Sequence, residues 1–577
     1  MIERAFARLL PRKRTWSRLL DLAVFAAVLA AFYGLLLMGR AVLRVSPPQQ
    51  QISQSPGALP LYAAESLIRI AIAYALSLLF AIAYGYLAAR SARAERILLP
   101  LLDILQSLPV LSFLPGVMLA MVALFHDHRL GVEFGAILLI FTGEAWNIAF
   151  SFYSSLKTIP RELDEAARLY RFGTWQRFTE LDLPFSAIGL VWNSMMGVAA
   201  GWFYLMACEM FVLGQRDFRL PGLGSFLQTA AGNGNMRGIL WGLAALIGVI
   251  VAVDQLVWRP VIAWSDKFKF EQVSSEATPQ SAVLNLLRRS GLAANFYRRA
   301  LRPVNETMTR ILAPRPLAAP ASTRASRAAR LWFWRAAVAI AAVGLGYLAI
   351  RAGRLLARLD PSDLAQIARG AGFTFLRVHA SLLIGALWSI PAGVAVGSSP
   401  RLARIAQPLA QVAASVPATA LFPVVLLVLI RVGGGMGLAA IILMLLGTQW
   451  YIFFNVIAGA MAIPSDLKEA ARIFRFSLWG RWRRLILPGI FPYLVTGMLT
   501  ASGGAWNASI VAEYFHFGGR TMVTRGLGAI ISQATDGGQF QLLLGATILM
   551  AAIVVVMNRL VWQRLYRLAE TRFKLEG

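Results

Sequence analysis

The chain has 577 residues, of which 58% are hydrophobic and only 15% are charged. A soluble globular protein carries about 25% charged residues, so this composition, with a mean hydropathy of +0.62, excludes a soluble protein and indicates one solvated mainly by lipid. The net charge of +28 does not indicate a nucleic-acid partner, because arginines gather beside apolar runs, as membrane topology requires, and no aromatic-interleaved basic patch is present.

The first apolar run, 19–39, follows a basic segment, 1–18. The run is too long for the core of a signal peptide, and no small-residue cleavage site follows it. We therefore predict a retained first span, with the segment 1–18 in the cytoplasm.

Eleven further apolar runs follow, each about as long as the 20 residues that cross a bilayer as a helix. We predict an all-α polytopic membrane protein with about 12 transmembrane helices, arranged as a six-helix domain at 19–262, a second at 331–562 and a cytoplasmic C-terminal segment at 563–577. The first-half spans are near 19–39, 64–89, 99–125, 133–155, 186–213 and 237–262. The second-half spans are near 331–350, 371–397, 404–430, 437–462, 489–514 and 541–562.

The stretch 263–330 joins the two halves. It is polar, basic and interrupted by prolines, and it contains an amphipathic segment, 282–312. We interpret it as a cytoplasmic linker with a helix that lies on the membrane surface or on a partner, in preference to a folded domain.

The chain contains one cysteine, Cys208, within an apolar run, and four histidines. A disulfide framework and a cysteine-based metal site are therefore excluded, and we expect no metal site of another kind. We also expect no catalytic residue, because acids, histidines and cysteines do not cluster near either membrane interface.

One stretch occurs twice. Residues 159–184 and 463–488, which lie 304 positions apart, agree at 14 of 26 positions without a gap. Each copy is a polar, helix-favouring island between apolar spans, and it begins with proline and acidic residues, which suit the first turn of a helix. An exposed aromatic face on so short a helix needs a groove in a partner. We call these copies the first knob and the second knob and predict that both are docking surfaces.

The repeat extends beyond the knobs. Arg69 recurs as Arg377, and the Gly-Leu-Gly sequence of 222–224 recurs at 526–528. A whole six-helix unit is therefore duplicated in parallel orientation. An even number of spans in each half places both knobs on one side of the membrane, which the cytoplasmic start of the first span makes the cytoplasm.

The knobs resemble the cytoplasmic Glu-Ala-Ala loop of permeases from binding-protein-dependent ABC importers, which inserts a coupling helix into a cleft of the ATPase subunit. The family pattern is Glu-Ala-Ala, three residues, Gly, and then a run to Leu-Pro. Residues 165–167 with 183–184 match it, as do 469–471 with 487–488. The Gly position holds arginine in both copies, and Gly173 can supply a turn in the first. The resemblance assigns ATPase coupling to Glu165, Ala166, Ala167, Arg168, Arg171, Phe172, Trp175, Glu469, Ala470, Ala471, Arg472, Arg475, Phe476 and Trp479.

The resemblance implies a type I ABC importer transmembrane fold with two parallel-repeat six-helix bundles, in a bacterial inner membrane with both termini cytoplasmic. The segments 107–109, 207–210 and 511–513 are similar to those of nitrate, sulfonate, taurine and bicarbonate permeases, which implies an anion as the solute. The chain has no Gly-Lys dipeptide and so no phosphate loop. ATP and Mg²⁺ would bind two copies of a separate ABC ATPase subunit, and a periplasmic or lipid-anchored substrate-binding protein would be the other partner.

Polar and aromatic residues within the spans are candidates for the substrate pathway, because an ionisable group at a span centre costs about 2.5–3.5 kcal/mol and usually faces a cavity. Breaks at prolines also free backbone donors for an oxyanion. A carboxylate suits an anion poorly unless it is paired or protonated, so tryptophan and neutral polar positions rank above the glutamates, and all of them can equally pack the bundles. The candidates are Trp146, Asn147, Trp202, Glu209, Gln449, Trp450, Trp506, Asn507, Glu513, Ser107, Ser415 and Thr419.

Two other functions are alternatives to an importer. An ion-gradient-driven secondary transporter with 6+6 parallel repeats needs no ATPase, but it leaves the repeated knobs unexplained. An integral-membrane enzyme needs clustered catalytic groups, which the sequence lacks.

Overall fold

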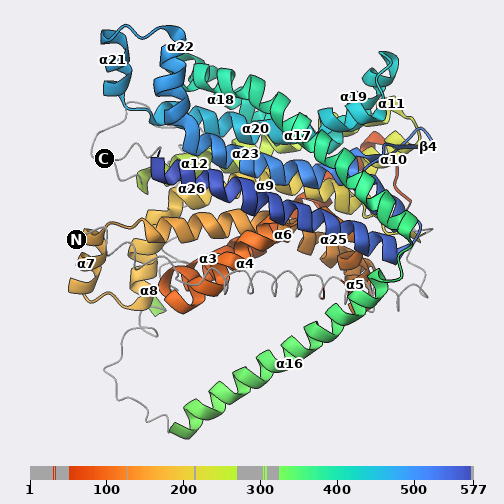
Figure 1. Ribbon diagram of the computed structural model, residues 1–577, viewed down its shortest axis with the longest axis horizontal. Coiled ribbons are helices and arrows are strands. Elements are labelled where there is room, and N and C mark those ends of the chain that lie inside the picture. The colour runs from red at the N-terminus through yellow and green to blue at the C-terminus, as the bar shows by residue number, and fades with distance from the viewer. Residues whose placement is uncertain are drawn as a thin grey trace.

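The computed structural model describes residues 51–125, 128–213, 216–268 and 324–572, apart from a few isolated positions. Within these ranges the chain is almost entirely helical, with two short β-hairpins. Long helices run side by side across the molecule, and α16 extends away from them (Figure 1). The predicted linker helix at 282–312 and most of the predicted first span at 19–39 lie outside the described residues.

The first half is built on three long helices, α3, α6 and α9, which pack against one another. The other described helices of this half are shorter than these three. The helices are α3 (Leu59–Arg90), α4 (Ala92–Ser107), α5 (Leu114–Leu124), α6 (His128–Lys157), α7 (Arg161–Leu169), α8 (Thr174–Arg177), α9 (Leu183–Glu209), α10 (Leu223–Gly232), α11 (Met236–Val253) and α12 (Arg259–Ser265). Strands β1 (Val212–Leu213) and β2 (Arg216–Asp217) pair antiparallel after α9.

The second half repeats this order, with α17, α20 and α23 in the places of α3, α6 and α9. The helices are α16 (Arg324–Leu356), α17 (Pro361–Gly397), α18 (Pro400–Ser415), α19 (Ala418–Arg431), α20 (Met436–Ala462), α21 (Ser465–Ile473), α22 (Leu478–Arg481), α23 (Leu487–Ala512), α24 (Leu527–Asp536), α25 (Phe540–Met557) and α26 (Gln563–Arg572). Strands β3 (Tyr514–Phe517) and β4 (Arg520–Val523) form the second hairpin.

The duplication predicted from the sequence is confirmed down to single turns. A π-helical turn joins the knob to the long helix in each half, at Phe178–Asp182 and at Trp482–Ile486. Another follows α11 at Asp254–Trp258 and α25 at Asn558–Trp562. Each pair lies 304 residues apart, the same spacing as the knobs.

Eight helices of the described residues are long and apolar enough to cross a membrane, or ten if each of two bent pairs is one span. Ten of the twelve predicted runs coincide with them, and the run predicted at 331–350 lies within α16. The bent pairs are α4 with α5, at 85°, and α18 with α19, at 86°. Both bends fall at a proline, Pro109 and Pro417, which cannot donate a helical hydrogen bond and disfavours helix in the residue before it.

The two halves interlock at the end of the molecule opposite the knobs. Helix α19 packs on α9, and α23 packs on the turn that precedes α5. The β3–β4 hairpin turns through Gly518 and Gly519, whose φ angles of 57° and 73° are those that a tight hairpin turn needs and that glycine supplies. Their N–H groups donate to the carbonyls of Ala231 (2.9 Å) and Gly232 (2.7 Å), so the hairpin of the second half caps α10 of the first.

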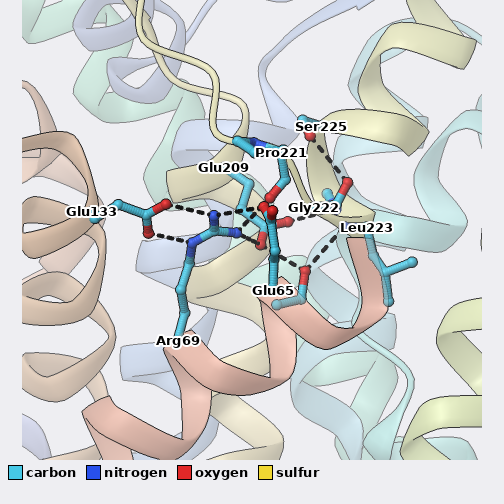
Figure 2. Close-up of polar contacts among 10 residues, drawn as sticks. Glu65, Arg69, Glu133, Glu209, Pro221, Gly222, Leu223 and Ser225 are labelled. Carbon is cyan, nitrogen blue, oxygen red and sulfur yellow. Dashed lines mark hydrogen bonds and ion pairs between the residues drawn. The ribbon is translucent and has the colours of Figure 1, made fainter. Parts of the chain in front are cut away.

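A buried ion pair holds the end of α9 in place, and we call it the first clasp (Figure 2). Arg69 Nη1 donates to Glu209 Oε1 at 2.8 Å and to the Pro221 carbonyl at 2.7 Å. Ser66, one turn earlier on α3, donates to the same carboxylate oxygen at 2.7 Å. The other carboxylate oxygen accepts from the Gly224 N–H at 2.7 Å. The first clasp therefore joins α3, the end of α9 and the start of α10.

The second clasp repeats this arrangement. Arg377 Nη1 donates to Glu513 Oε1 at 2.8 Å and to the Arg525 carbonyl at 2.7 Å. Thr374 takes the place of serine and donates to Glu513 at 2.8 Å, while the Gly528 N–H donates to the other oxygen at 2.9 Å. Both glutamates are fully buried. In lipid no water replaces such partners, so each carboxylate is satisfied by protein groups alone.

The repeated Gly-Leu-Gly sequence is explained by the clasps. A Cβ on Gly222 would lie 2.2 Å from Glu209 Oε1, and a Cβ on Gly526 would lie 2.0 Å from Glu513 Oε2. Both glycines have extended backbones, so the close approach of the carboxylate, and not the backbone angle, requires glycine.

The clasps differ in their outer partners. Arg69 also makes a two-point ion pair with Glu133, at 2.6 and 2.8 Å, and a longer contact of 3.4 Å with Glu65. In the second half, Phe373 and Gly437 occupy the equivalent positions, and Arg377 instead donates to Thr524 at 2.8 Å. The second arginine therefore depends on one carboxylate, whereas the first is shared among three.

Replacing Glu513 by alanine should lower the free energy of unfolding by about 3–5 kcal/mol, because it leaves the largely buried guanidinium of Arg377 and two buried donors without their partner. Glu209→Ala should cost less, since Arg69 keeps its ion pair with Glu133. The control is Lys157→Ala, which removes an exposed ion pair with Glu95 (2.9 Å) and should cost less than about 1 kcal/mol. Denaturant unfolding of the purified chain measures all three. Equal, small losses would show that the clasps do not hold the fold.

Candidate functional site

Each knob is a short helix followed by a tight turn and a second helical turn that leads into a long helix. Helix α7 begins after Pro160 with Glu162 and Asp164 in its first turn, and α21 begins after Pro464 with Asp466. Acidic side chains there favour the positive end of the helix dipole. Both knobs lie at the same end of the molecule, the left end of Figure 1, whereas α10, α19 and β4 lie at the other.

The turn after each knob helix is made by arginine. Arg171 and Arg475 are the two non-glycine residues of positive φ in the described chain, at 51° and 48°. The Phe172 N–H donates to the Ala167 carbonyl and the Arg171 N–H to the Arg168 carbonyl, each at 3.0 Å. This is the hydrogen-bond pattern with which a left-handed residue closes a helix, usually with glycine.

The second knob repeats the same two bonds. The prediction that Gly173 supplies a turn is therefore wrong, because Gly173 has a φ of −64° and is the N-cap residue directly before α8. The arginine keeps the geometry that the family's glycine would give, at a cost of about 1–2 kcal/mol for a left-handed residue with a Cβ.

The turn leaves an apolar surface exposed on each knob. Leu169 and Tyr170 are 82% and 78% exposed in the first, and Phe474 is 74% exposed in the second. Glu165 and Glu469 are also exposed, while Ala167 and Ala471 are buried against the bundle. Exposed apolar surface beside charged side chains is typical of a protein–protein interface.

The remaining predicted coupling residues differ in how far their side chains are exposed. Arg168, Arg171, Arg472 and Arg475 are exposed, and Ala166, Ala470, Phe172 and Phe476 are half-buried. The two tryptophans differ, because Trp175 is half-buried and its ring lies 5.6 Å from that of Phe178, whereas Trp479 is 72% exposed.

Internal ion pairs stabilise the first knob. Asp164 pairs with Arg168 at 2.8 Å and also with Arg177, which approaches Asp182 at 3.7 Å. Burial alone would raise the pKa of Asp164, but the hydrogen bond and charge of Arg177, with the charge of Arg168, lower it overall. Asp182 also pairs with Arg90 at the end of α3, which ties the knob to its bundle.

The second knob has a different charge pattern. Lys468 and Ile486 replace the two aspartates, and Arg483 and Arg484 replace Thr179 and Glu180. The guanidinium of Arg484 lies 5.7 Å from the ring of Phe476. The backbone shape is thus repeated while the surface charge is not.

The predicted substrate-pathway residues fall into three groups. Trp146 and Trp450 pack within their own halves, against Phe80 and Trp388, and Asn147 and Gln449 are bonded to Gln106 and Trp388 there. Glu209 and Glu513 belong to the clasps, which also engage Arg69 and Arg377. The others lie on α4, α9, α18, α19 and α23: Trp202, Trp506, Asn507, Thr419, Ser415 and Ser107.

Part of that last group lies where the halves meet. Asn507 Oδ1 accepts from the Leu111 N–H of the other half at 3.3 Å. Trp506 Nε1 and the Thr419 hydroxyl are buried and have no hydrogen-bond partner among the described residues. Trp202 is buried, and the Ser415 hydroxyl bonds back to its own helix at Gln411.

A cavity of about 480 Å³ lies between the halves at the end opposite the knobs. It contains none of the twelve predicted residues. Its lining is drawn from both halves: Leu111, Leu114, Pro115, Ala207, Met210, Phe211, Arg219, Gln228, Thr229, Gly232 and Asn233 from the first, and Ile510, Val511, Tyr514, Phe515, His516, Ile531, Ser532, Thr535 and Asp536 from the second. The sequence points to this cavity only indirectly, since part of the lining lies close to the two clasp glutamates, on either side of each in the chain.

Comparison with known proteins places these features in a family. The model of the binding-protein-dependent transport system inner membrane component matches the chain twice, at 67–257 and 385–574. Similar proteins include the nitrate import permease NrtB of Leptolyngbya laminosa, 28% identical over 32% of this chain and 63% of its own length. The bicarbonate transport permease CmpB of Synechococcus elongatus is 28% identical, with the same coverage, and the taurine transport permease TauC of Escherichia coli is 28% identical over 31% of this chain and 60% of its own.

The chain thus spans less than two thirds of the length of these relatives. The family model, in contrast, matches about two thirds of the chain and does so once in each six-helix unit. The chain therefore belongs to the family of binding-protein-dependent transport system inner membrane components, and it carries two such units in one polypeptide.

Proposed function

We propose that this chain is the complete membrane pathway of an ATP-driven importer, with the two fused units providing its two walls. The observation that carries the proposal is the pair of knobs, which share a backbone geometry, lie at one end of the molecule and expose apolar side chains there. Two copies of an ABC ATPase would dock on them and bind ATP and Mg²⁺. The knob end would then face the cytoplasm of a bacterial cell, with both termini on that side.

The solute would pass between the halves. The cavity opens there, and Asn507 joins the halves by accepting from Leu111, which lines the cavity. Trp506 and Thr419 add buried polar atoms that have no partner among the described residues. A substrate-binding protein on the outer side would deliver the solute to the cavity. The nitrate, bicarbonate and taurine permeases among the relatives favour an anionic group on that solute.

A secondary transporter remains the alternative function. It would use ionisable side chains in the spans as an ion relay, but the most prominent of these, Glu209 and Glu513, are fully engaged with arginine, hydroxyl and backbone donors. Both glutamates therefore have a structural role in the clasps, and a secondary transporter would leave the exposed knobs unexplained.

Changing Glu165 and Glu469 together to lysine should abolish ATPase docking, because it reverses one exposed charge on each knob where a partner surface has to match it. We expect co-purification with the ATPase and ATP-dependent uptake both to fall by more than about tenfold, as for central interface residues. The matched control is Asp360→Lys with Asp363→Lys, at the start of α17 on the opposite end, which should retain both. Uptake that survives the knob variant and depends on an ion gradient would favour the secondary transporter.

Replacing Arg171 and Arg475 by glycine should keep the knobs intact and raise the free energy of unfolding by up to about 1 kcal/mol each, because glycine relieves left-handed strain but loses more entropy on folding. Valine at the same positions, which disfavours positive φ strongly, should destabilise the turn and weaken ATPase docking. Unfolding curves and co-purification of the two double variants measure this. If valine is tolerated as well as glycine, the turn has no part in docking.

A further inference from the structure

The cavity between the halves is built from equivalent positions of the two units. Met210 corresponds to Tyr514, and Phe211 to Phe515, at the 304-residue spacing of the repeat. A solute in the cavity would therefore contact both bundles at once. Since the knobs lie at the other end of α9, which with α8 forms a continuous helix of 36 residues, about 50 Å long, the cavity is the first part of the pathway that a solute from outside meets.

The cavity is large enough to hold an organic solute. A volume of about 480 Å³ lies within the range of pockets that bind drug-sized organic ligands, about 300–1,000 Å³. Because one water takes up about 30 Å³, an inorganic anion such as nitrate would leave most of the space to water. The rings of Phe211, Tyr514 and Phe515 offer apolar faces that such an anion would not use.

The charges of the lining come from opposite halves. Arg219, from the loop after β2, donates to Thr229 at 3.1 Å. Asp536, at the end of α24, accepts from Tyr514 through Oδ2, and its Oδ1 has no hydrogen-bond partner within the described part of the chain. Neither charge is repeated in the other half. The position equivalent to Arg219 is Val523, and the position equivalent to Asp536 is Gly232.

We propose that the cavity binds an organic acid that carries a protonated amine, with its anionic group toward Arg219 and its ammonium group toward Asp536. This deepens the proposed function, on which it depends, by naming the class of solute. A carboxylate accepts only when ionised and repels a bare anion, whereas an ammonium group gives it a charge-assisted hydrogen bond. The ring of Tyr514, bonded to the same carboxylate, adds a face on which a cation is attracted.

The test uses two probes that differ only in the ammonium group, taurine and ethanesulfonate, with nitrate as a third. They are titrated calorimetrically into the full chain in nanodiscs without ATP. Taurine should bind at least about tenfold more tightly than ethanesulfonate or nitrate, the ratio expected of one hydrogen bond to a charged group. Asp536→Asn should remove that ratio while leaving ethanesulfonate binding unchanged or stronger, and Arg219→Gln should weaken both sulfonates.

Two controls keep the result interpretable. Arg237→Gln changes an exposed arginine of α11 that does not line the cavity and should alter neither affinity. Asp536→Glu keeps the carboxylate and should keep taurine binding above ethanesulfonate binding, and thermal unfolding of each variant shows whether Asp536→Asn is folded.

The proposal fails if ethanesulfonate or nitrate binds as well as taurine, if the ratio survives in Asp536→Asn, or if no probe binds. None of these results touches ATPase docking at the knobs. The importer function fails separately, if the chain with intact knobs does not bind an ATPase.

Discussion

The pairing of an arginine with a buried glutamate, made once in each half, determines how the end of this permease opposite the knobs is built. Glu209 and Glu513 each accept from an arginine, a hydroxyl and the first amides of the next helix. A span that ends inside lipid leaves polar backbone groups that water cannot reach, and a buried charge without its partner is costly. The clasps meet both needs at once, which is why arginine, glutamate and the two glycines recur together in both units.

The clasps also connect the two working ends of the molecule. In each half one continuous helix runs from the knob to the clasp, Thr174–Glu209 in the first and Leu478–Ala512 in the second. The lining of the cavity includes residues from the last turn of that helix and residues just past the clasp glutamate. One continuous helix therefore connects each knob to the cavity, and the ion pairs between Asp182, Arg90 and Arg177 fix the first knob to its bundle. The ends of these two helices that lie away from the knobs line one cavity.

Much of this architecture could be predicted from the sequence, because repetition marks it. The knobs, the parallel duplication and ten of the twelve spans follow from apolar runs and from residues that recur at one spacing. The clasps could not be predicted, although Arg69 and Glu209 each stand out in the sequence, because their pairing depends on how α3 packs against the end of α9. The left-handed turn at Arg171 was missed because only glycine signals it in a sequence. Arg219 and Asp536 were missed because each occurs in one half alone, so the repeat gives no sign of them.

The proposed importer function requires that ATP bound by a partner ATPase moves the two knobs relative to each other. Spin labels on cysteines placed at Arg161 and Ser465, the first residues of α7 and α21, report that distance, after the single native cysteine, Cys208, is replaced by alanine. Measured by pulsed electron resonance in the complex with the ATPase, the distance between the labels should shorten by several ångström when ATP binds and recover after hydrolysis. An unchanged distance in a complex that hydrolyses ATP and transports its solute would contradict the account.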